Sequence, residues 1–348
     1  MDASHRGNVI AAQLFSAKGG HAVDKRLNVT IAMFDYDRTL ALRNGQVQAK
    51  GLELNFLKLR WEEIFWRMLR HQEFDASEMS LSSLILARSM GMDDLVGLPI
   101  FPSRLFRHSC IYVHPASGIR QPQDLIGKRV GVPEYQVTAA LWARAVLHHE
   151  YGVKASDVHW ITGGTEQAGR VEKIPLHLPP EIHVEHAGPD KALEPMLEAG
   201  ELDALISGLV PRSLLRKDGK VERLFPDFAA REKAYYRKTG LLPIMHTFVV
   251  RKKLLDEHPW VAKSLYDAFV AAKDAAYRHL RQRDMLLTSV PWMEHYIDEI
   301  SEMMGEDYWP YGVERNRHVL ESVIQFSYEQ GIIQRKLSVE ELYPVAVE

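Results

Sequence analysis

The sequence has a single cysteine among its 348 residues, so no disulfide can form within the chain. That cysteine, Cys110, lies in an apolar run over residues 110–113. These surroundings favour a buried, inert thiol over a nucleophile, because a nucleophilic thiolate needs a base partner that the sequence does not show. We therefore expect neither a disulfide scaffold nor cysteine chemistry.

Long hydrophobic runs are also missing. Nowhere do about 18 apolar residues follow one another, as a helix that crosses a bilayer requires. Residues 1–26 contain only short apolar patches, interrupted by Gln13, Ser16 and Lys18, and lack the continuous apolar stretch of a secretory signal. We expect residues 1–26 to form a polar tail, and we expect a cytoplasmic protein without a membrane partner.

Neither sign of charge dominates the chain. The 43 Lys and Arg residues and 46 Asp and Glu residues give a formal net charge of −3 at pH 7. This balance lacks the basic excess that binding to a phosphate backbone requires, so we expect no nucleic-acid partner. A hydrophobic fraction of 46% and a charged fraction of 26% are ordinary for a globular protein and exclude disorder. At about 150 residues per domain, the length allows two domains.

The common catalytic signatures are absent as well: there is no P-loop, Rossmann glycine triplet, G-x-S-x-G elbow or H-E-x-x-H helix. The residue type in surplus is histidine, with 16 copies, which permits acid–base chemistry or metal binding without proving either. His148 and His149 are adjacent on a predicted helix, where neighbouring side chains point in different directions, so we do not expect them to share a metal.

Hydrophobic periodicity alternates between strand and helix along the chain. Residues 27–32 alternate apolar and polar side chains, as a half-buried strand does, and residues 61–69 carry an apolar stripe with helical spacing. The same reasoning predicts further strands at 52–59, 74–76, 107–113, 128–133, 158–161, 202–206 and 244–250, and further helices at 84–90, 137–151, 259–272 and 316–330.

This alternation indicates an α/β protein with two lobes, each a mixed sheet flanked by helices. Residues 114–118 are rich in turn formers and precede a fresh α/β unit, so we place the first crossing there. The strand at 244–250 then carries the chain back. We expect lobe I to comprise residues 27–113 and 241–348, lobe II to comprise residues 114–240, and a cleft to lie between them.

Polar clusters stand at the ends of the predicted strands, where open α/β sheets bind ligands. Arginine and the free N–H groups of helices that begin after Ser82 and Thr138 would suit a carboxylate. Any one cluster could instead be a helix cap or a surface ion pair, but the set favours a shared cleft. The clusters are residues 35–38, 78–83, 107–109, 134–138, 162–164, 207–208 and 246–247.

Several of these stretches resemble the 4,5-dihydroxyphthalate decarboxylase family, over about residues 27–342. The matching blocks are residues 34–42 (FDYDRTLAL), 62–85, 106–144, 201–208 (ELDALISG), 243–252 with 258–269, and 307–317 (DYWPYGVERNR). The resemblance implies a fold related to type II periplasmic binding proteins. It also implies the loss of one carboxylate from 4,5-dihydroxyphthalate to give protocatechuate, without an organic cofactor.

Such a reaction needs a proton donor over the ring carbon, a base near the phenol and an anchor for the carboxylate that stays. We expect His246 or His108 as the donor. The other expected contacts are Arg38 or Arg107 as the anchor, aided by Ser80, Ser82 and Thr138; Glu134, Asp35 or Glu78 as the acceptor; Tyr36 and Tyr135 against the ring; and Thr162, Gly163 and Ser207 in the cleft wall.

Alternatives stay open at this point. Glu78, His108, Glu134 and His246 are suitable ligand types for a divalent metal, although their spacing does not demand one. A solute-binding protein for an aromatic or organic anion, or a related enzyme with another aromatic acid substrate, would fit the same scaffold. We expect a small aromatic acid as the partner and leave a homo-oligomer open.

Overall fold

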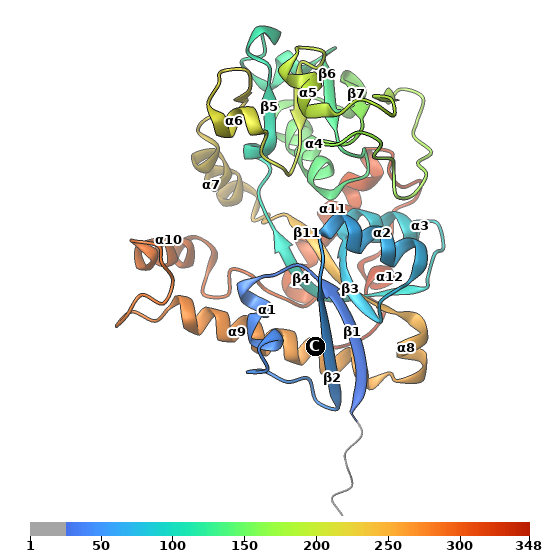
Figure 1. The fold of residues 1–348 in the computed structure, drawn as a ribbon, viewed down its shortest axis with the longest axis vertical. Helices are drawn as coiled ribbons and strands as arrows, with labels where there is room; N and C mark the ends of the chain where they lie inside the picture. The colour runs from blue at the N-terminus through green and yellow to red at the C-terminus, as the bar shows by residue number, and fades with distance from the viewer. Residues whose placement is uncertain (1–25) are drawn as a thin grey trace, which may run out of the picture.

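The computed structural model describes residues 26–348, so the polar tail expected over residues 1–26 lies almost wholly outside the described residues. The chain forms two lobes, each built around one sheet (Figure 1). A five-stranded sheet has the order β2-β1-β3-β11-β4, and a six-stranded sheet has the order β10-β5-β9-β6-β7-β8. None of the helices within residues 26–348 has the length and apolar character that crossing a membrane requires.

The first sheet is mixed. β1 (Leu27–Met33) pairs in parallel with β2 (Leu52–Lys58) and β3 (Ala76–Ser80), whereas β11 (Ile244–Arg251) runs antiparallel between β3 and β4 (Leu95–Arg104). The helices of this lobe are α1 (Asp37–Arg43), α2 (Trp61–His71), α3 (Leu81–Ser89), α8 (Lys252–Glu257), α9 (Trp260–Leu280) and α10 (Met293–Met304). On α2 the predicted stripe is buried at Ile64, Phe65 and Met68, which confirms this helix.

The second sheet is mixed as well. Its strands are β5 (Ile111–Val113), β6 (Arg129–Val132), β7 (His159–Thr162), β8 (Val184–His186), β9 (Ala204–Ile206) and β10 (Glu222–Arg223), and its helices are α4 (Thr138–Tyr151), α5 (Leu193–Glu198), α6 (Arg212–Arg216) and α7 (Phe228–Thr239). Gly131 in β6 leaves room for two leucine side chains of the core, since a Cβ there would stand 2.8 Å from Leu202 Cδ1 and 3.1 Å from Leu205 Cδ1.

The first crossing comes earlier in the chain than the sequence suggested. The strand expected over residues 107–113 is a short 3₁₀ turn at His108–Cys110 followed by β5, which belongs to the second sheet. The polar triplet at 107–109 does not alternate with apolar residues, and Cys110 N–H turns back to the Arg107 carbonyl oxygen. The chain therefore crosses between β4 and β5, before residues 114–118, and returns through α7 into β11.

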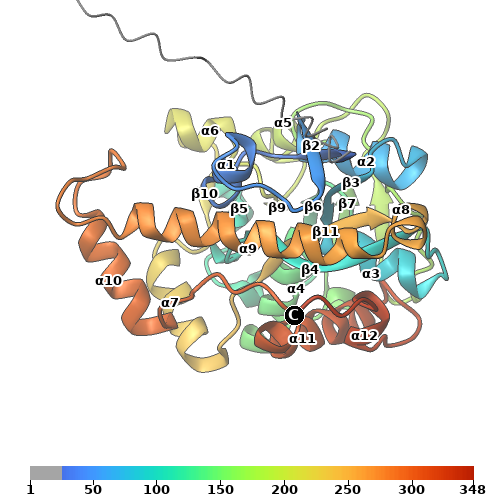
Figure 2. The ribbon, with the colours of Figure 1, turned by 90° about the horizontal axis from the view of Figure 1, so that it is seen from below.

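The last third of the chain ties the lobes together. Helix α11 (Arg317–Glu329) packs against α4 of the second lobe and α3 of the first, with α12 (Val339–Leu342) beside it (Figure 2). Gln330, just after α11, accepts hydrogen bonds from Arg144 Nε at 2.7 Å and from the Tyr135 hydroxyl at 3.0 Å. Residues of both lobes thus share one hydrophobic core.

Cys110 is buried, as expected. Burial raises the pKa of its thiol to about 11, so the group is a neutral thiol at pH 7.

Candidate active site

A cavity of about 260 Å³ lies between the lobes and is lined by residues of both. The first lobe supplies the ends of β3, β4 and β11 together with the loop after β1 and the start of α2. The second lobe supplies the N-terminus of α4 and the segments after β6, β7 and β9. Its polar wall includes Tyr36, Glu62, Ser80, Ser103, Arg107, Thr138, Thr165, Arg170, Lys173, Ser207 and His246.

A buried carboxylate joins two of these polar groups. His246 pairs with Ser80 across β11 and β3, which makes His246 and Glu78 diagonal neighbours on one face of the sheet. Glu78 Oε1 lies 2.5 Å from His246 Nδ1 and accepts a hydrogen bond of 2.5 Å from the Tyr36 hydroxyl. Its other oxygen accepts the Phe34 N–H at 3.0 Å. The carboxylate therefore fixes the orientation of both the imidazole and the phenol.

The electrostatics keep Glu78 ionised. Complete burial alone would raise the pKa of the Glu78 carboxyl, but the charge of His246 and the hydrogen bonds from His246, Tyr36 and Phe34 N–H bring it below its ordinary value. Burial, followed by the charge of Glu78, raises the pKa of Tyr36, which stays a neutral phenol. The carboxylate contact assigns the Nδ1 proton of His246 and leaves Nε2 for the cavity.

Arg107 offers a positive charge to the cavity. Arg107 as a whole is 8% exposed, and its guanidinium donates from Nε to Met245 Sδ at 3.0 Å and contacts no carboxylate among the described residues. Burial lowers its pKa, yet a guanidinium stays charged at neutral pH. Thr138 and Ala139, at the N-terminus of α4, line the same cavity, and the first N–H groups of a helix have no partner within it. Together these groups form a site for an anion.

A cluster of three hydroxyl groups connects the two lobes beside the cavity. Thr138 Oγ1 lies 2.9 Å from both Ser80 Oγ and Ser82 Oγ, and it accepts the Ser82 N–H at 3.1 Å. These contacts join the N-terminus of α3 in the first lobe to that of α4 in the second. Ser207 lines the cavity from the end of β9.

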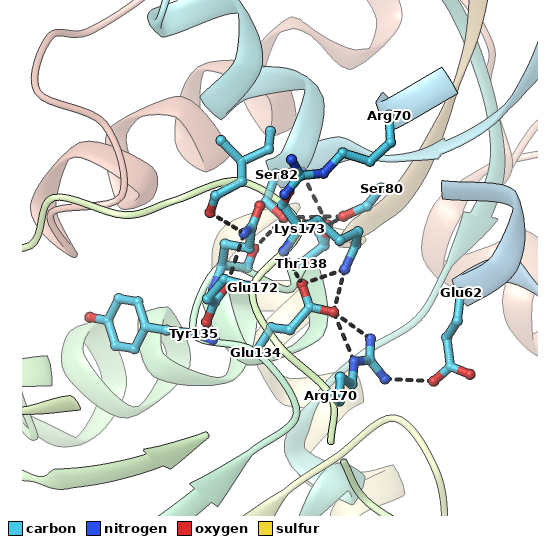
Figure 3. A network of polar contacts seen from close by, with 12 residues as sticks. Glu62, Arg70, Ser80, Ser82, Glu134, Tyr135, Thr138, Arg170, Glu172 and Lys173 are labelled. Carbon is cyan, nitrogen blue, oxygen red and sulfur yellow. Dashed lines mark hydrogen bonds and ion pairs between the residues drawn. The ribbon is translucent and has the colours of Figure 1, made fainter. Parts of the chain in front are cut away.

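Glu134 lies at the rim of the cavity inside an ion-pair network (Figure 3). Both of its oxygens contact Lys173 Nζ, and Arg170 donates to it from Nε at 2.8 Å. Arg170 Nη1 also lies 2.5 Å from Glu62 Oε1 on α2 of the first lobe. Burial opposes ionisation, but the charges of Lys173 and Arg170 outweigh it and lower the pKa of Glu134.

Other candidates from the sequence lie outside the cavity. Asp35 forms ion pairs with Arg43 and Lys58 at the surface. Arg38 stands between the rings of Tyr36 and Trp309, 4.2 and 4.3 Å from their centroids, and donates to the Pro102 carbonyl oxygen.

The remaining candidates belong to the second lobe. Tyr135 is buried and donates to Gln330 O, and Thr162 Oγ1 donates to Glu185 O at 3.3 Å. Gly163, which follows β7, lines no part of the cavity. His108 is 2% exposed and packs between Phe225 and Tyr235. Burial lowers its pKa to about 4.

Several residues that line the cavity or contact His246 carry no signal in the sequence that marks them as site residues. Phe65 belongs to the apolar stripe of α2 and packs edge-on against His246, with ring centroids 5.0 Å apart. Ser103 follows Pro102 in β4 and pairs with His246 across the sheet. Arg170 and Lys173 lie in a loop without periodicity, so only their charge singles them out.

The possible metal ligands of the sequence do not converge. Glu78 touches His246, whereas both oxygens of Glu134 face cations and His108 lies in an aromatic cluster. Within residues 26–348, a group that could hold a metal is formed by His148, His149 and Glu329, whose ligand atoms lie within 4.8 Å of one another. The two histidines are thus closer to a common point than expected, but they occupy the far end of α4 from the cavity.

The comparisons with known proteins fit this architecture. Residues 101–172 match the family model described as NMT1/THI5 like. The alkanesulfonate-binding protein SsuA from Xanthomonas axonopodis pv. citri, solved with bound MOPS, aligns with a TM-score of 0.53 at 12% identity and covers 91% of this chain and 98% of its own. The desulfurization enzyme DszB aligns with a TM-score of 0.52 at 17% identity, covering 91% and 96%. These likenesses confirm the predicted two-lobed fold.

Relatives with similar sequences identify the family more closely than the structural neighbours do. A protein of Pseudomonas putida named 4,5-dihydroxyphthalate decarboxylase is 43% identical over 212 residues, which cover 61% of this chain and 82% of that protein. A protein of the same name from Comamonas testosteroni is 38% identical over 324 residues, which cover 93% of this chain and 98% of that protein. With this identity over almost the full length of both proteins, the chain belongs to the 4,5-dihydroxyphthalate decarboxylase family.

Proposed function

We propose that this chain decarboxylates 4,5-dihydroxyphthalate to protocatechuate and CO₂ in the cavity between the lobes. The observation that carries the proposal is the Glu78–His246 pair, an acid–base unit that borders the same cavity as Arg107, a guanidinium with no carboxylate partner within residues 26–348. The names of the family relatives supply the substrate. The two carboxylates of this diacid are equivalent by symmetry, so its orientation in the cavity decides which one leaves.

Arg107 and the N-terminus of α4 hold the carboxylate that stays. A guanidinium binds a carboxylate through two parallel hydrogen bonds, which fixes the plane of the ring as well as its position. The apolar wall, which includes Phe34, Trp61 and Phe65, covers the ring. The departing carboxylate can then stand out of the ring plane, where its C–C bond overlaps the π system.

His246 delivers the proton. In the first step the ring carbon that bears the departing carboxylate takes a proton from Nε2, while the hydroxyl para to it gives its proton toward Tyr36 and Glu78. In the second step the C–C bond breaks, its electron pair returns to the ring, and CO₂ leaves. The ring oxygen recovers its proton from Tyr36 and Glu78, and His246 takes a new one from solvent. Glu134 and His108 have no part in this scheme, because their contacts hold them away from the ring.

The main rival is a solute-binding protein for an aromatic or organic anion, which the fold of SsuA also favours. Anion capture needs Arg107 and the helix N-terminus but gives no role to the Glu78–His246 pair. Incubating the protein with 4,5-dihydroxyphthalate and following CO₂ and protocatechuate separates the two. Turnover supports the decarboxylase, whereas tight binding without turnover supports the solute-binding protein.

Turnover of a different aromatic acid in place of this diacid would support a related enzyme on the same scaffold. The cytoplasmic location and the homo-oligomer stay predictions, which cell fractionation and light scattering would test.

A further inference from the structure

Arg170 is one of the residues that join the second lobe to the first, and it lies at the mouth of the cavity. It lies in the loop between β7 and β8 and donates to Glu134 of its own lobe and to Glu62 on α2 of the other (Figure 3). It lines both the cavity and a neighbouring hollow of about 510 Å³, which Glu62 and Lys173 also border. A ligand that passes from the hollow into the cavity therefore meets Arg170.

The charges around Arg170 do not balance within the second lobe. Lys173 and Arg170 supply two positive charges and Glu134 supplies one negative charge, so the group carries an excess of one positive charge. Glu172 forms no ion pair with Arg170 or Lys173 within residues 26–348: its oxygens accept hydrogen bonds from Gln136 and from the backbone N–H of Tyr135, and burial and the charge of Glu134 raise its pKa. Glu62, across the cleft, supplies the missing negative charge.

The two partners of Arg170 are held with unequal strength. Glu134 is 2% exposed and contacts two cations, whereas the Glu62 side chain is 34% exposed and contacts Arg170 alone among the described residues. Partly exposed ion pairs contribute little net energy, because water solvates the separated groups well. The Glu62 carboxylate is therefore the partner that another carboxylate can replace.

We propose that Arg170 selects ligands with a second carboxylate, and that Glu62 forms the ion pair with Arg170 when no such ligand is bound. This inference rests on the proposed function for the identity of the ligand. Arg107 holds one carboxylate of the diacid, and Arg170 exchanges Glu62 for the other. The product has a single carboxylate, so it cannot hold both guanidinium groups, and Glu62 returns to Arg170 as the product leaves.

Calorimetric binding of phthalate, which has two adjacent carboxylates, and of benzoate, which has one, tests the proposal without turnover. Arg170→Gln should weaken phthalate binding by about tenfold, the effect of losing a charged hydrogen bond, and change benzoate binding by less than about twofold. Glu62→Gln should strengthen phthalate binding severalfold, because it removes the competitor and leaves the Glu134–Lys173–Arg170 group intact.

The opposite effects of the two variants on phthalate affinity distinguish ligand selection from an ion pair that only stabilises the contact between the lobes. If the Glu62–Arg170 pair only holds the lobes together, both variants weaken both ligands alike, and that result overturns the proposal. Glu62→Gln keeps the test decisive even if Arg170→Gln unfolds, because strengthening of phthalate supports the exchange and weakening rejects it. If the two variants change phthalate binding as expected but the protein does not turn over 4,5-dihydroxyphthalate, the decarboxylase is rejected and this inference stands. If the protein turns over 4,5-dihydroxyphthalate but Glu62→Gln does not strengthen phthalate binding, this inference is rejected and the decarboxylase stands.

Discussion

Glu78 Oε1 lies 2.5 Å from His246 Nδ1, and the carboxylate is wholly buried while the imidazole reaches the cavity. This contact between diagonal residues on β3 and β11 places an ionised carboxylate behind a proton donor. Replacing Glu78 by Gln keeps the size of the side chain but removes its charge. We expect kcat to fall by about 10² or more, since a positioned acid–base group contributes this much, while KM changes little.

The acid limit of the activity follows from the same carboxylate. The pKa of Glu78 is lower in the folded protein than its ordinary value, so the charge and the stability that depend on it are present at neutral pH and are lost only as the pH falls through the lowered value. A pH–rate profile should therefore show activity through mildly acidic pH. An acid limb near neutrality that disappears in Glu78→Gln would contradict this assignment.

Arg107 is expected to govern substrate affinity. Arg107→Lys keeps the positive charge but loses the planar fork, so we expect KM for 4,5-dihydroxyphthalate to rise by about tenfold with a smaller change in kcat. Steady-state kinetics measure both constants. Arg212→Lys is the matched control, because Arg212 lies on α6 beside the exposed Glu166 and away from the cavity. Equal effects of the two variants would remove Arg107 from the site.

The buried ion pairs of Glu134 are expected to stabilise the fold. Glu134→Gln leaves the buried Lys173 and the largely buried Arg170 without their shared carboxylate, and breaking a buried pair costs about 3 kcal/mol of unfolding free energy. Urea unfolding measures this loss. The double variant Glu134→Gln with Lys173→Met removes the unpaired ammonium and should recover a large part of it. A single variant as stable as the wild type would show that the network is dispensable.

His108 is expected to make the fold sensitive to acid. Burial lowers its pKa to about 4 in the folded protein, against about 6.5 for an unperturbed histidine. The unfolded chain binds the proton more readily between these values, so the contribution of His108 is full above about pH 6.5 and is lost as the pH falls toward 4. His108→Phe keeps an aromatic ring between Phe225 and Tyr235 without a titrating group.

Urea unfolding at pH 7 and pH 5 tests this expectation. The wild type should lose more stability than His108→Phe between the two pH values, by up to about 2 kcal/mol. His177→Asn, at an exposed position, should follow the wild type. Parallel losses in the wild type and His108→Phe would assign the acid sensitivity to other groups.

The periodic parts of the fold could be predicted from the sequence because they depend on one buried face per element. The periodicity of residues 27–32 and 61–69 indicated β1 and α2. The polar pair at residues 246–247 of another predicted strand made His246 a candidate proton donor. Glu78, by contrast, was expected after a strand at 74–76 but lies within β3, which runs to Ser80. Side chains of β3 are buried on both faces, so alternation does not mark the limits of this strand.

Directions of side chains after a strand end could not be predicted. Tyr135 and Glu134 are adjacent, yet one turns into the core of the second lobe and the other meets Lys173 at the cavity rim. Asp35 and Tyr36 separate in the same way, to a surface ion pair and to Glu78. Partners elsewhere in the chain decide these directions, and a loop without periodicity leaves no local signal for them.

Turnover of 4,5-dihydroxyphthalate in D₂O tests whether His246 protonates the ring carbon that loses its carboxylate. We expect equal amounts of CO₂ and protocatechuate, with one deuterium on the ring carbon next to the one that carries the retained carboxylate. His246→Gln should keep the fold and lose this reaction by about 10² or more. Binding of the diacid without CO₂ release, or a His246→Gln variant with near-normal turnover, would contradict this expectation.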